Sequence, residues 1–492
     1  MGGGLLQLVC RGQQDYYLCK NPDFSLFKYV YKKHTNFAME TVRLDFNNTP
    51  LFEPNVFNGE YKCKILRYGD LLKNLYFCCT LPDIYSSSTL AFKWVKNIGN
   101  ILVKSATVKI DGNTIDNLTN DWLNIWNELT MGCDDDNLGK LIGNVQELNN
   151  PIVINSRKVI LSNNKFAYNY YPASSKNNSI PSIKSHKLVV PLPFWFTRNP
   201  SLALPLLRLQ GNEITLTIRL ENTERLYTVY SYDINENVSP LFYNELYSKD
   251  LNSGIKKKEA IDIKTFTKSL NIDPYIEATY VFLDNVERNM IFKKTIINYL
   301  VEQLEITSQN SFNINNLIGN INVNTNKPTK EIIWITRRND YMNKFNSHHN
   351  FTASIRQNNN YPILNKASII WDKTKIIVDD KNHIFYNKIQ PYQCHSNVPN
   401  EGIYLYSFAI NPEKNNPSGY YNAALVETKL RLEFNKYNQL DENYNLNLAL
   451  NRHNKFKDAG IDANLDNYLV DVYSITYNIF EIIGRSVGMK FA

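Results

Sequence analysis

The sequence predicts an all-β protein built from two tandem sandwiches, and three observations carry this prediction. Tyr (32) and Phe (24) raise the aromatic fraction to 13% of the 492 residues, while charged residues make up only 21%, a balance that favours buried strands. Segments in which polar and apolar residues alternate recur along the whole chain. A five-residue motif also appears twice in the same local context, which indicates a duplicated domain.

The alternating segments are separated by clusters of Asn, Gly, Pro and Ser, which favour turns. In the clearest of them Ile214, Leu216, Ile218 and Leu220 lie on one side and polar residues on the other, as in a half-buried strand. Similar segments are TVRLDF at 41–46, SATVKID at 105–111, NINVN at 320–324 and KLRLEFN at 429–435. We therefore expect strands from end to end of the chain.

One segment has helical spacing instead. In NDWLNIWNEL at 120–129, two Trp, one Ile and one Leu recur at i, i+3, i+4 and i+7, which predicts a helix with a single apolar face. Asn120 or Asp121 is available as its N-cap. We expect this helix to plug one end of a barrel.

A proline-rich apolar stretch, PLPFWFTRNPSLALPLLRL, starts at Pro191. Its prolines remove backbone donors, so the stretch is predicted to be a shaped loop or an edge, not a helix interior or a central strand. A long apolar loop needs a cover. We therefore predict that Phe194, Trp195, Phe196 and Pro200 pack between two sandwiches or between two subunits.

The repeated motif begins inside this stretch. FTRNP at 196–200 reappears as FAINP at 408–412, an offset of 212 residues. Each copy follows an aromatic segment and precedes a loop that leads into an alternating strand. Phe408 and Pro412 are therefore predicted to have the same packing role as their counterparts. The Lys-rich stretch at 223–268 is the expected join between the two domains.

Charge and cysteine content exclude some classes of function. The net charge is +7, but the 54 basic and 47 acidic groups are spread along the chain, without the basic arm that nucleic-acid binding requires. Seven cysteines form an odd set without a CxxC pair, so reduced thiols are expected. We find no signal peptide pattern and no apolar run long enough to span a bilayer, which predicts a cytosol-like compartment.

No catalytic, metal-binding or cofactor-binding residues are predicted. GRSVG at 484–488 matches a nucleophile elbow, but only four residues follow it and none is Asp, Glu or His, so the chain order of a hydrolase fails. The seven histidines form no HxH pair, and no phosphate-binding loop is present. Sequons make Asn117, Asn237 and Asn350 possible glycosylation sites, although some are expected by chance in an Asn-rich chain.

Longer segments resemble the major capsid proteins of nucleocytoplasmic large DNA viruses. The resemblance rests on GGGLLQLVCRGQQDYYL at the start, NPDFSLFKYVYKKHTNFAMETV at 21–42, WVKNIGNILVKSATVKIDGNTID at 94–116, PLPFWFTRNPSLALPLLRLQGNEI, YVFLDNVERNMIF at 280–292 and IQPYQCHSNVPNEGIYLYSFAINPEKNNPSG at 389–419. Each segment alone is weak evidence of a resemblance, but the segments occur in the same order as in the family and cover most of the chain.

The resemblance implies a double jelly roll, two eight-stranded sandwiches in one chain. On that basis we expect an inner-face arm at residues 1–25, a first jelly roll at 26–225, a linker at 226–270 and a second jelly roll at 271–492. It also implies a homotrimer with a pseudo-hexagonal outline, tiling of an icosahedral shell, and assembly in the host cytoplasm into the virion.

The implied partners are the chain itself, neighbouring capsomers, minor capsid and penton proteins, and an internal viral membrane reached by the arm. Neither a cofactor nor sequence-specific nucleic-acid binding is expected. The alternative is a jelly-roll binding module, a minor capsid or glycan-attachment protein that uses aromatic loops such as YNYY at 168–171 or YTVYSY at 227–232.

Overall fold

The computed structural model describes most of the chain. The described residues are 3–13, 15–48, 59–86, 90–131, 136–151, 157–158, 169–170, 180–231, 236–249, 260–313, 317–353, 361–372, 375–414, 416–435 and 467–491. Two groups of eight strands dominate these residues, and each group forms a sandwich of two antiparallel sheets.

The first sandwich pairs its strands in the orders β1-β13-β3-β9 and β2-β10-β5-β6. Every pairing in these two sheets is antiparallel. The strands are β1 (Phe37–Asp45), β2 (Glu60–Lys64), β3 (Leu71–Leu81), β5 (Val103–Ile110), β6 (Asn113–Thr119), β9 (His186–Pro191), β10 (Ile214–Leu220) and β13 (Tyr275–Leu283).

The second sandwich has the orders β14-β22-β16-β19 and β15-β21-β17-β18. Its strands are β14 (Ile296–Asn313), β15 (Ile318–Val323), β16 (Pro328–Arg338), β17 (Leu364–Trp371), β18 (Lys375–Asn382), β19 (Ile403–Ser407), β21 (Thr428–Phe434) and β22 (Asn467–Ile483). When the strands of each sandwich are numbered from one to eight in chain order, the two sheets of both sandwiches have the strand orders 1-8-3-6 and 2-7-4-5. The prediction of two tandem eight-stranded jelly rolls is confirmed.

The duplicated motif occupies the same place in both jelly rolls. FTRNP at 196–200 and FAINP at 408–412 each lie between the sixth and seventh strands. The alternating segments that follow them are β10 and β21, and the inward residues of β10, from Ile214 to Leu220, are buried as the alternation predicts. The two copies of the motif, 212 residues apart, therefore lie in equivalent connections of the two jelly rolls.

The strand pairing places the boundary between the two halves later in the chain than predicted. β13 is hydrogen-bonded to β1 and β3 of the first jelly roll, although the predicted second domain begins at residue 271. Residues 226–270, predicted as the linker, instead contain parts of an insertion between strands seven and eight. We propose that the first jelly roll runs to Leu283 and that α10 (Asn285–Lys293) joins the halves. The Lys-rich composition of residues 226–270 indicated an exposed linker. The domain boundary, however, depends on the long-range pairing of β13.

Short helices and small sheets occupy the connections. The insertion pairs β11 (Tyr227–Ser231) with β4 (Leu90–Trp94) and β12 (Glu236–Val238). The remaining elements include α1 (Gly3–Val9), α2 (Asp15–Cys19), α3 (Ile98–Leu102), α4 (Asn120–Thr130), α5 (Asp136–Ile142), α6 (Gln146–Asn149), β7 (Arg157–Lys158), β8 (Asn169–Tyr170), α8 (Trp195–Arg198), α9 (Pro240–Lys249), α11 (Asn339–Phe345), η6 (Phe385–Ile389), α12 (Gln390–Cys394), β20 (Tyr421–Asn422) and β23 (Ser486–Met489).

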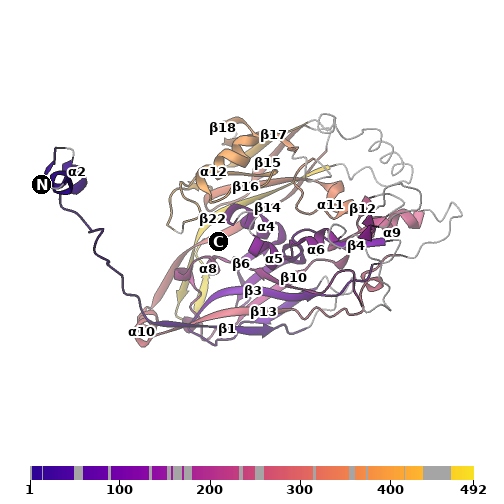
Figure 1. Ribbon diagram of the computed structural model, residues 1–492, viewed down its shortest axis with the longest axis horizontal. Coiled ribbons are helices and arrows are strands. Elements are labelled where there is room, and N and C mark those ends of the chain that lie inside the picture. Colours follow the sequence, from indigo (N-terminus) through magenta and orange to yellow (C-terminus); the bar gives the residue numbers. More distant parts are fainter. Residues whose placement is uncertain are drawn as a thin grey trace.

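The predicted helix at 120–129 is confirmed as α4, but its cap lies one residue earlier than expected. Thr119 has an extended backbone, and its Oγ1 accepts a hydrogen bond from the Trp122 amide at 3.4 Å. Asn120 and Asp121 are already the first helical residues. The helix lies between the two jelly rolls in Figure 1, so it packs at their junction.

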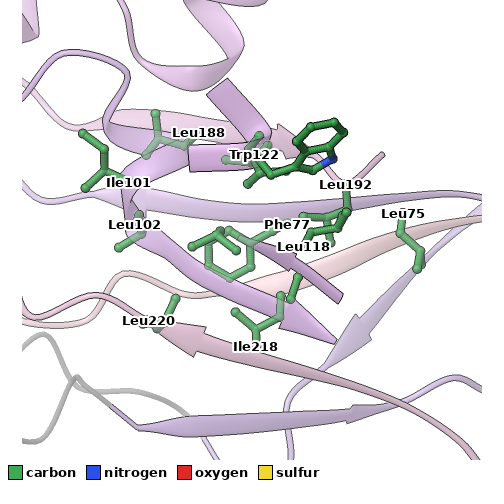
Figure 2. Close-up of a cluster of buried hydrophobic side chains, with 14 of the residues drawn as sticks. Leu75, Phe77, Ile101, Leu102, Leu118, Trp122, Leu188, Leu192, Ile218 and Leu220 are labelled. Atoms are coloured by element: carbon green, nitrogen blue, oxygen red, sulfur yellow. The ribbon is translucent and has the colours of Figure 1, made fainter. Parts of the chain in front are cut away.

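The two jelly rolls share one hydrophobic core. In Figure 2, side chains from β3, β6, β9, β10, α3 and α4 meet inside the first jelly roll, among them Leu75, Phe77, Leu118, Trp122, Leu188 and Ile218. The same cluster continues into the second half through Ile333, Ile403, Tyr473 and Phe480. A second, separate cluster fills the interior of the second jelly roll. The junction between the halves is therefore packed like a domain interior.

Candidate assembly surfaces

The proline-rich stretch is a compact connection with one helical turn. α8 begins at Trp195, and Phe194, Trp195 and Phe196 are at most 1% exposed. The rings of Phe194 and Phe196 stack at 5.5 Å, and Trp195 lies 5.2 Å from the ring of Phe480 in β22. The first half thus buries its aromatic loop against the second half of the same chain.

The other predicted packing residues, Pro200, Phe408 and Pro412, differ in how far they are buried. Pro200 is exposed at the start of a 3₁₀ turn. Pro412 is buried, and its carbonyl accepts a hydrogen bond from Lys330 Nζ at 2.6 Å. Phe408 is half-buried 4.4 Å from the Tyr421 ring. The second copy of the motif therefore packs on its own jelly roll, unlike the first.

Further contacts join the halves around α4. The rings of Trp122 and Tyr473 lie 5.9 Å apart. On the neighbouring strand, Gln303 Nε2 donates to the Ile115 carbonyl at 2.9 Å. β6, α4 and α8 of the first half thus form one surface that covers the sheet β14-β22-β16-β19.

A buried charge cluster lies within this junction. Arg337 of β16 donates to both carboxylate oxygens of Asp121, at 3.1 and 2.7 Å, and also to Asp471 of β22. Burial alone would raise the pKa of Asp121, but the Arg337 guanidinium holds it below its usual range. For Asp471 burial prevails and the pKa is raised. Sequence reasoning missed this cluster, because its members are 134 and 216 residues apart.

A second ionic group crosses the junction near α8. Arg198 lies 3.4 Å from Glu302 of β14, and the nearly inaccessible Lys330 also pairs with Glu302. The Arg198 guanidinium is stacked 4.2 Å from the Trp126 ring centre. These contacts fix α8 and α4 against the second jelly roll.

His395, directly after α12, contacts Glu413, the residue that follows the second copy of the motif. Its Nδ1 lies 3.1 Å from Glu413, and its Nε2 lies 3.4 Å from the fully buried Glu331. Ser396 also hydrogen-bonds to Glu413 through its amide, at 2.8 Å, and its hydroxyl. Burial lowers the pKa of His395, but the two carboxylates raise it to about 9, so His395 is a cation at neutral pH.

We expect this cluster to make the protein sensitive to alkaline pH. Because the pKa of His395 is raised from 6.5 to about 9 by folding, its stabilisation is complete below the unfolded pKa and is lost as the pH rises through the folded one. Melting temperatures of the wild type and His395→Gln should therefore differ at pH 7 and converge by pH 10. An equal difference at both pH values would contradict this role.

The match to a nucleophile elbow at 484–488 lies in a β-hairpin. Gly484, at φ 60°, forms the turn between β22 and β23, and Ser486 is the first residue of β23, so the strand-turn-helix context of a nucleophile elbow is missing. Among the described residues no three His, Cys, Asp or Glu side chains are grouped to hold a metal ion.

The possible glycosylation sites lie in different environments. Asn350 is 2% exposed, and its side-chain oxygen accepts hydrogen bonds from Thr352, so the folded chain has no room for a glycan there. Asn117 is half-buried and bonded to Thr107, and Asn237 is half-buried on β12. Glycosylation of Asn117 and Asn237 stays a prediction.

One of the two aromatic segments proposed for glycan binding, YTVYSY at 227–232, begins inside the core. Tyr227 is completely buried, with its ring stacked 4.6 Å from Phe92. Of YNYY at 168–171, only residues 169 and 170 lie within the described residues, where they form β8. Residues 227–229 of YTVYSY are therefore ordinary core.

The amino-terminal segment extends away from the body in Figure 1. α1 buries none of its residues, and apolar side chains are exposed along the segment, including Leu5, Leu8, Val9, Phe24 and Phe27. No helix in the described part of the chain is long and apolar enough to cross a membrane. An apolar segment of this kind needs a partner surface.

Comparison with known proteins matches both halves of the chain. Residues 25–284 match the family model described as "Major capsid protein N-terminus", and residues 287–488 match "Large eukaryotic DNA virus major capsid protein". The major capsid protein of Pyramimonas orientalis virus is 28% identical over the full length of both chains. That of Chrysochromulina ericina virus is 30% identical over 68% of this chain and 58% of its own.

Solved structures show the same fold. The quasi-atomic model of the PBCV-1 virus capsid superposes with a TM-score of 0.62 at 21% identity, covering 95% of this chain and 100% of that one. The Faustovirus major capsid protein gives a TM-score of 0.62 at 13% identity, covering 95% and 94%. At these identities the likeness supports the double jelly-roll fold alone.

Proposed function

Because the chain belongs to the major capsid proteins of large eukaryotic DNA viruses, we propose that three copies associate into a capsomer with a pseudo-hexagonal outline. The protein is a structural component of the capsid, and its location is the capsid shell of the virion. One observation carries the proposal: both halves have the strand orders 1-8-3-6 and 2-7-4-5. Three copies with two equivalent units each supply six similar positions around a closed ring.

We propose that capsomers then tile an icosahedral shell through weaker lateral contacts, with minor capsid and penton proteins as further partners. The exposed apolar side chains of residues 3–31 support a role for the arm in binding such a protein or an internal membrane. The arm leaves the body close to β1 and α10 in Figure 1, so its contacts lie at that end of the molecule.

We also propose that the chain has no enzymatic activity. Support comes from the position of Ser486 in a β-hairpin and from the structural roles of two buried cations: Arg337 pairs with Asp471, and His395 pairs with Glu413. Neither a cofactor nor sequence-specific nucleic acid enters the proposal.

The mass of the purified protein in solution tests the proposal. Light scattering coupled to gel filtration should give about 171 kDa, three times the chain mass of 57.1 kDa, as expected of a closed trimeric ring. Electron microscopy of that peak should show particles with a hexagonal outline. A monomer that persists at high protein concentration would contradict self-assembly of this chain.

A further inference from the structure

Besides the apolar junction, a polar contact joins the two halves at the end of the molecule opposite the arm. In Figure 1 α11 of the second half lies beside β12 and α9, which belong to the insertion between strands seven and eight of the first half. Ser239 of this insertion donates two hydrogen bonds to α11. Its hydroxyl donates to the Asn343 carbonyl at 2.8 Å and its amide to the Lys344 carbonyl at 2.7 Å. Because α10 joins the halves at the other end, the chain is held together at both ends.

The segment that follows α11 continues this polar contact. Asn346 adopts the left-handed conformation, at φ 49°, and its side chain donates to the carbonyls of Glu224 and Tyr227 at 2.8 and 2.7 Å. Two residues later, His348 Nε2 donates to the Arg225 carbonyl at 3.0 Å. We call this contact the seam and define it as residues 343–349 together with residues 224–227 and Ser239.

Two adjacent histidines lie inside the seam. His348 is 4% exposed. Both ring nitrogens of His349 are buried without a hydrogen-bond partner in the described part of the chain, and its ring lies 6.3 Å from that of Phe351. An imidazolium has two N–H donors and a full charge, and burying these without partners costs far more than burying a neutral ring. The seam therefore accepts the neutral form of these side chains.

The charged groups around the two histidines are already paired with one another. They come from several elements: Asp121 of α4, Arg337 of β16, Asp471 of β22, Glu221 and Arg225 from the segment after β10, and Lys96 from the segment before α3. Arg337 pairs with both aspartates, and Glu221 lies 3.7 Å from Lys104. The carboxylates are thus neutralised before any histidine is charged, so a further positive charge in the seam gains little from them.

We propose that His348 and His349 form an acid-sensitive latch. As neutral rings they hold the seam closed at neutral pH, and mildly acidic solution, in which they become charged, releases the insertion from the second half. The latch belongs to the folded chain itself, so it does not depend on the proposed trimer. A capsid shell built from such chains would weaken at every copy when it is acidified, since each copy contains the seam.

The pKa values give the direction of this pH effect. Burial lowers the pKa of His349 from 6.5 to about 3 and also lowers the pKa of His348, against smaller opposing effects that include the Asp121 carboxylate. Because folding lowers both values, the stabilisation is complete above the unfolded pKa and is lost as the pH falls below it towards the folded one. Asp471 has the opposite effect, since burial raises its pKa. A test must therefore change the histidines alone.

His348→Gln combined with His349→Phe tests the latch. The Gln amide can still donate to the Arg225 carbonyl, and the Phe ring fills the site without titratable nitrogens, so stability at pH 7 should stay near that of the wild type. Urea denaturation followed by circular dichroism measures the change from pH 7 to pH 5. The folding equilibrium constant of the wild type should fall on the order of 20-fold through His349 alone. The double variant should lose much less, and an equal loss in both proteins would overturn the proposal.

The matched control removes a histidine outside the seam. His34 is exposed on the arm, so His34→Gln should show the same loss of stability between pH 7 and pH 5 as the wild type. A pH dependence that disappears in this variant would assign the effect to the arm and contradict the latch.

Hydrogen exchange of the wild type locates the effect without any substitution. After correction for the intrinsic exchange rate at each pH, peptides that contain the Ser239 amide should lose protection at pH 5, because this amide donates to Lys344 across the seam. Peptides from β3, inside the first jelly roll, should remain protected. Unchanged protection at Ser239 would overturn the proposal, and an equal loss in β3 would show general acid unfolding instead of a latch.

Discussion

Trp195→Ala should lower the free energy of unfolding by roughly 3 to 5 kcal/mol, the cost of truncating a large buried aromatic side chain. Trp195 is 1% exposed and packs on both Phe196, at 5.4 Å, and Phe480, at 5.2 Å. The substitution would leave a cavity at the junction between the halves. The strands on either side belong to different sheets and cannot move in to fill it. Urea denaturation followed by circular dichroism measures the change.

The control for this prediction is an exposed aromatic residue. Phe27 is completely exposed on the arm, so Phe27→Ala should change the free energy of unfolding by less than about 0.5 kcal/mol. Unaltered stability of Trp195→Ala would show that the aromatic loop is not packed between the jelly rolls.

Arg337→Met should be about as damaging, with an expected loss of roughly 3 to 5 kcal/mol, because it leaves the carboxylates of Asp121 and Asp471 buried without their cation. The side chains of all three residues are at most 12% exposed. The same denaturation experiment measures the loss, and the variant should also melt at a lower temperature than the wild type.

Two further variants show whether the loss comes from unpaired buried charge. Arg219→Met breaks an exposed pair with Glu60, so it should cost no more than about 1 kcal/mol. Combining Arg337→Met with Asp121→Leu and Asp471→Leu removes all three charges and should recover much of the lost stability. A triple variant less stable than Arg337→Met alone would contradict the electrostatic explanation.

Much of the fold was predictable because it depends on local patterns. Alternation identified β1, β5, β10, β15 and β21, and helical spacing identified α4. The repeated motif at 196–200 and 408–412 correctly predicted two equivalent connections in two equivalent domains. These signals are local because a half-buried strand requires a period of two and an amphipathic helix a period near 3.6.

Local patterns were insufficient wherever partners are distant in sequence. The composition of residues 226–270 indicated a linker, but β13 returns to pair with β1 from the start of the chain. Asp121 meets Arg337 across 216 positions, and no spacing rule connects them. The contact order of a jelly roll is high, so its boundaries are defined by pairing and not by composition.

The sequence by itself determined the all-β class, the duplication and the apolar character of the loop around Trp195, since each depends on which residues are neighbours along the chain. Only the tertiary structure decided which of two equivalent loops is covered. In the first, Phe196 is completely buried beside Trp195, which packs against Phe480 of β22, while in the second the equivalent Phe408 is half-buried against Tyr421 of its own jelly roll. The physical reason is that one chain contains two similar units and a single junction, so one surface of each kind remains uncovered.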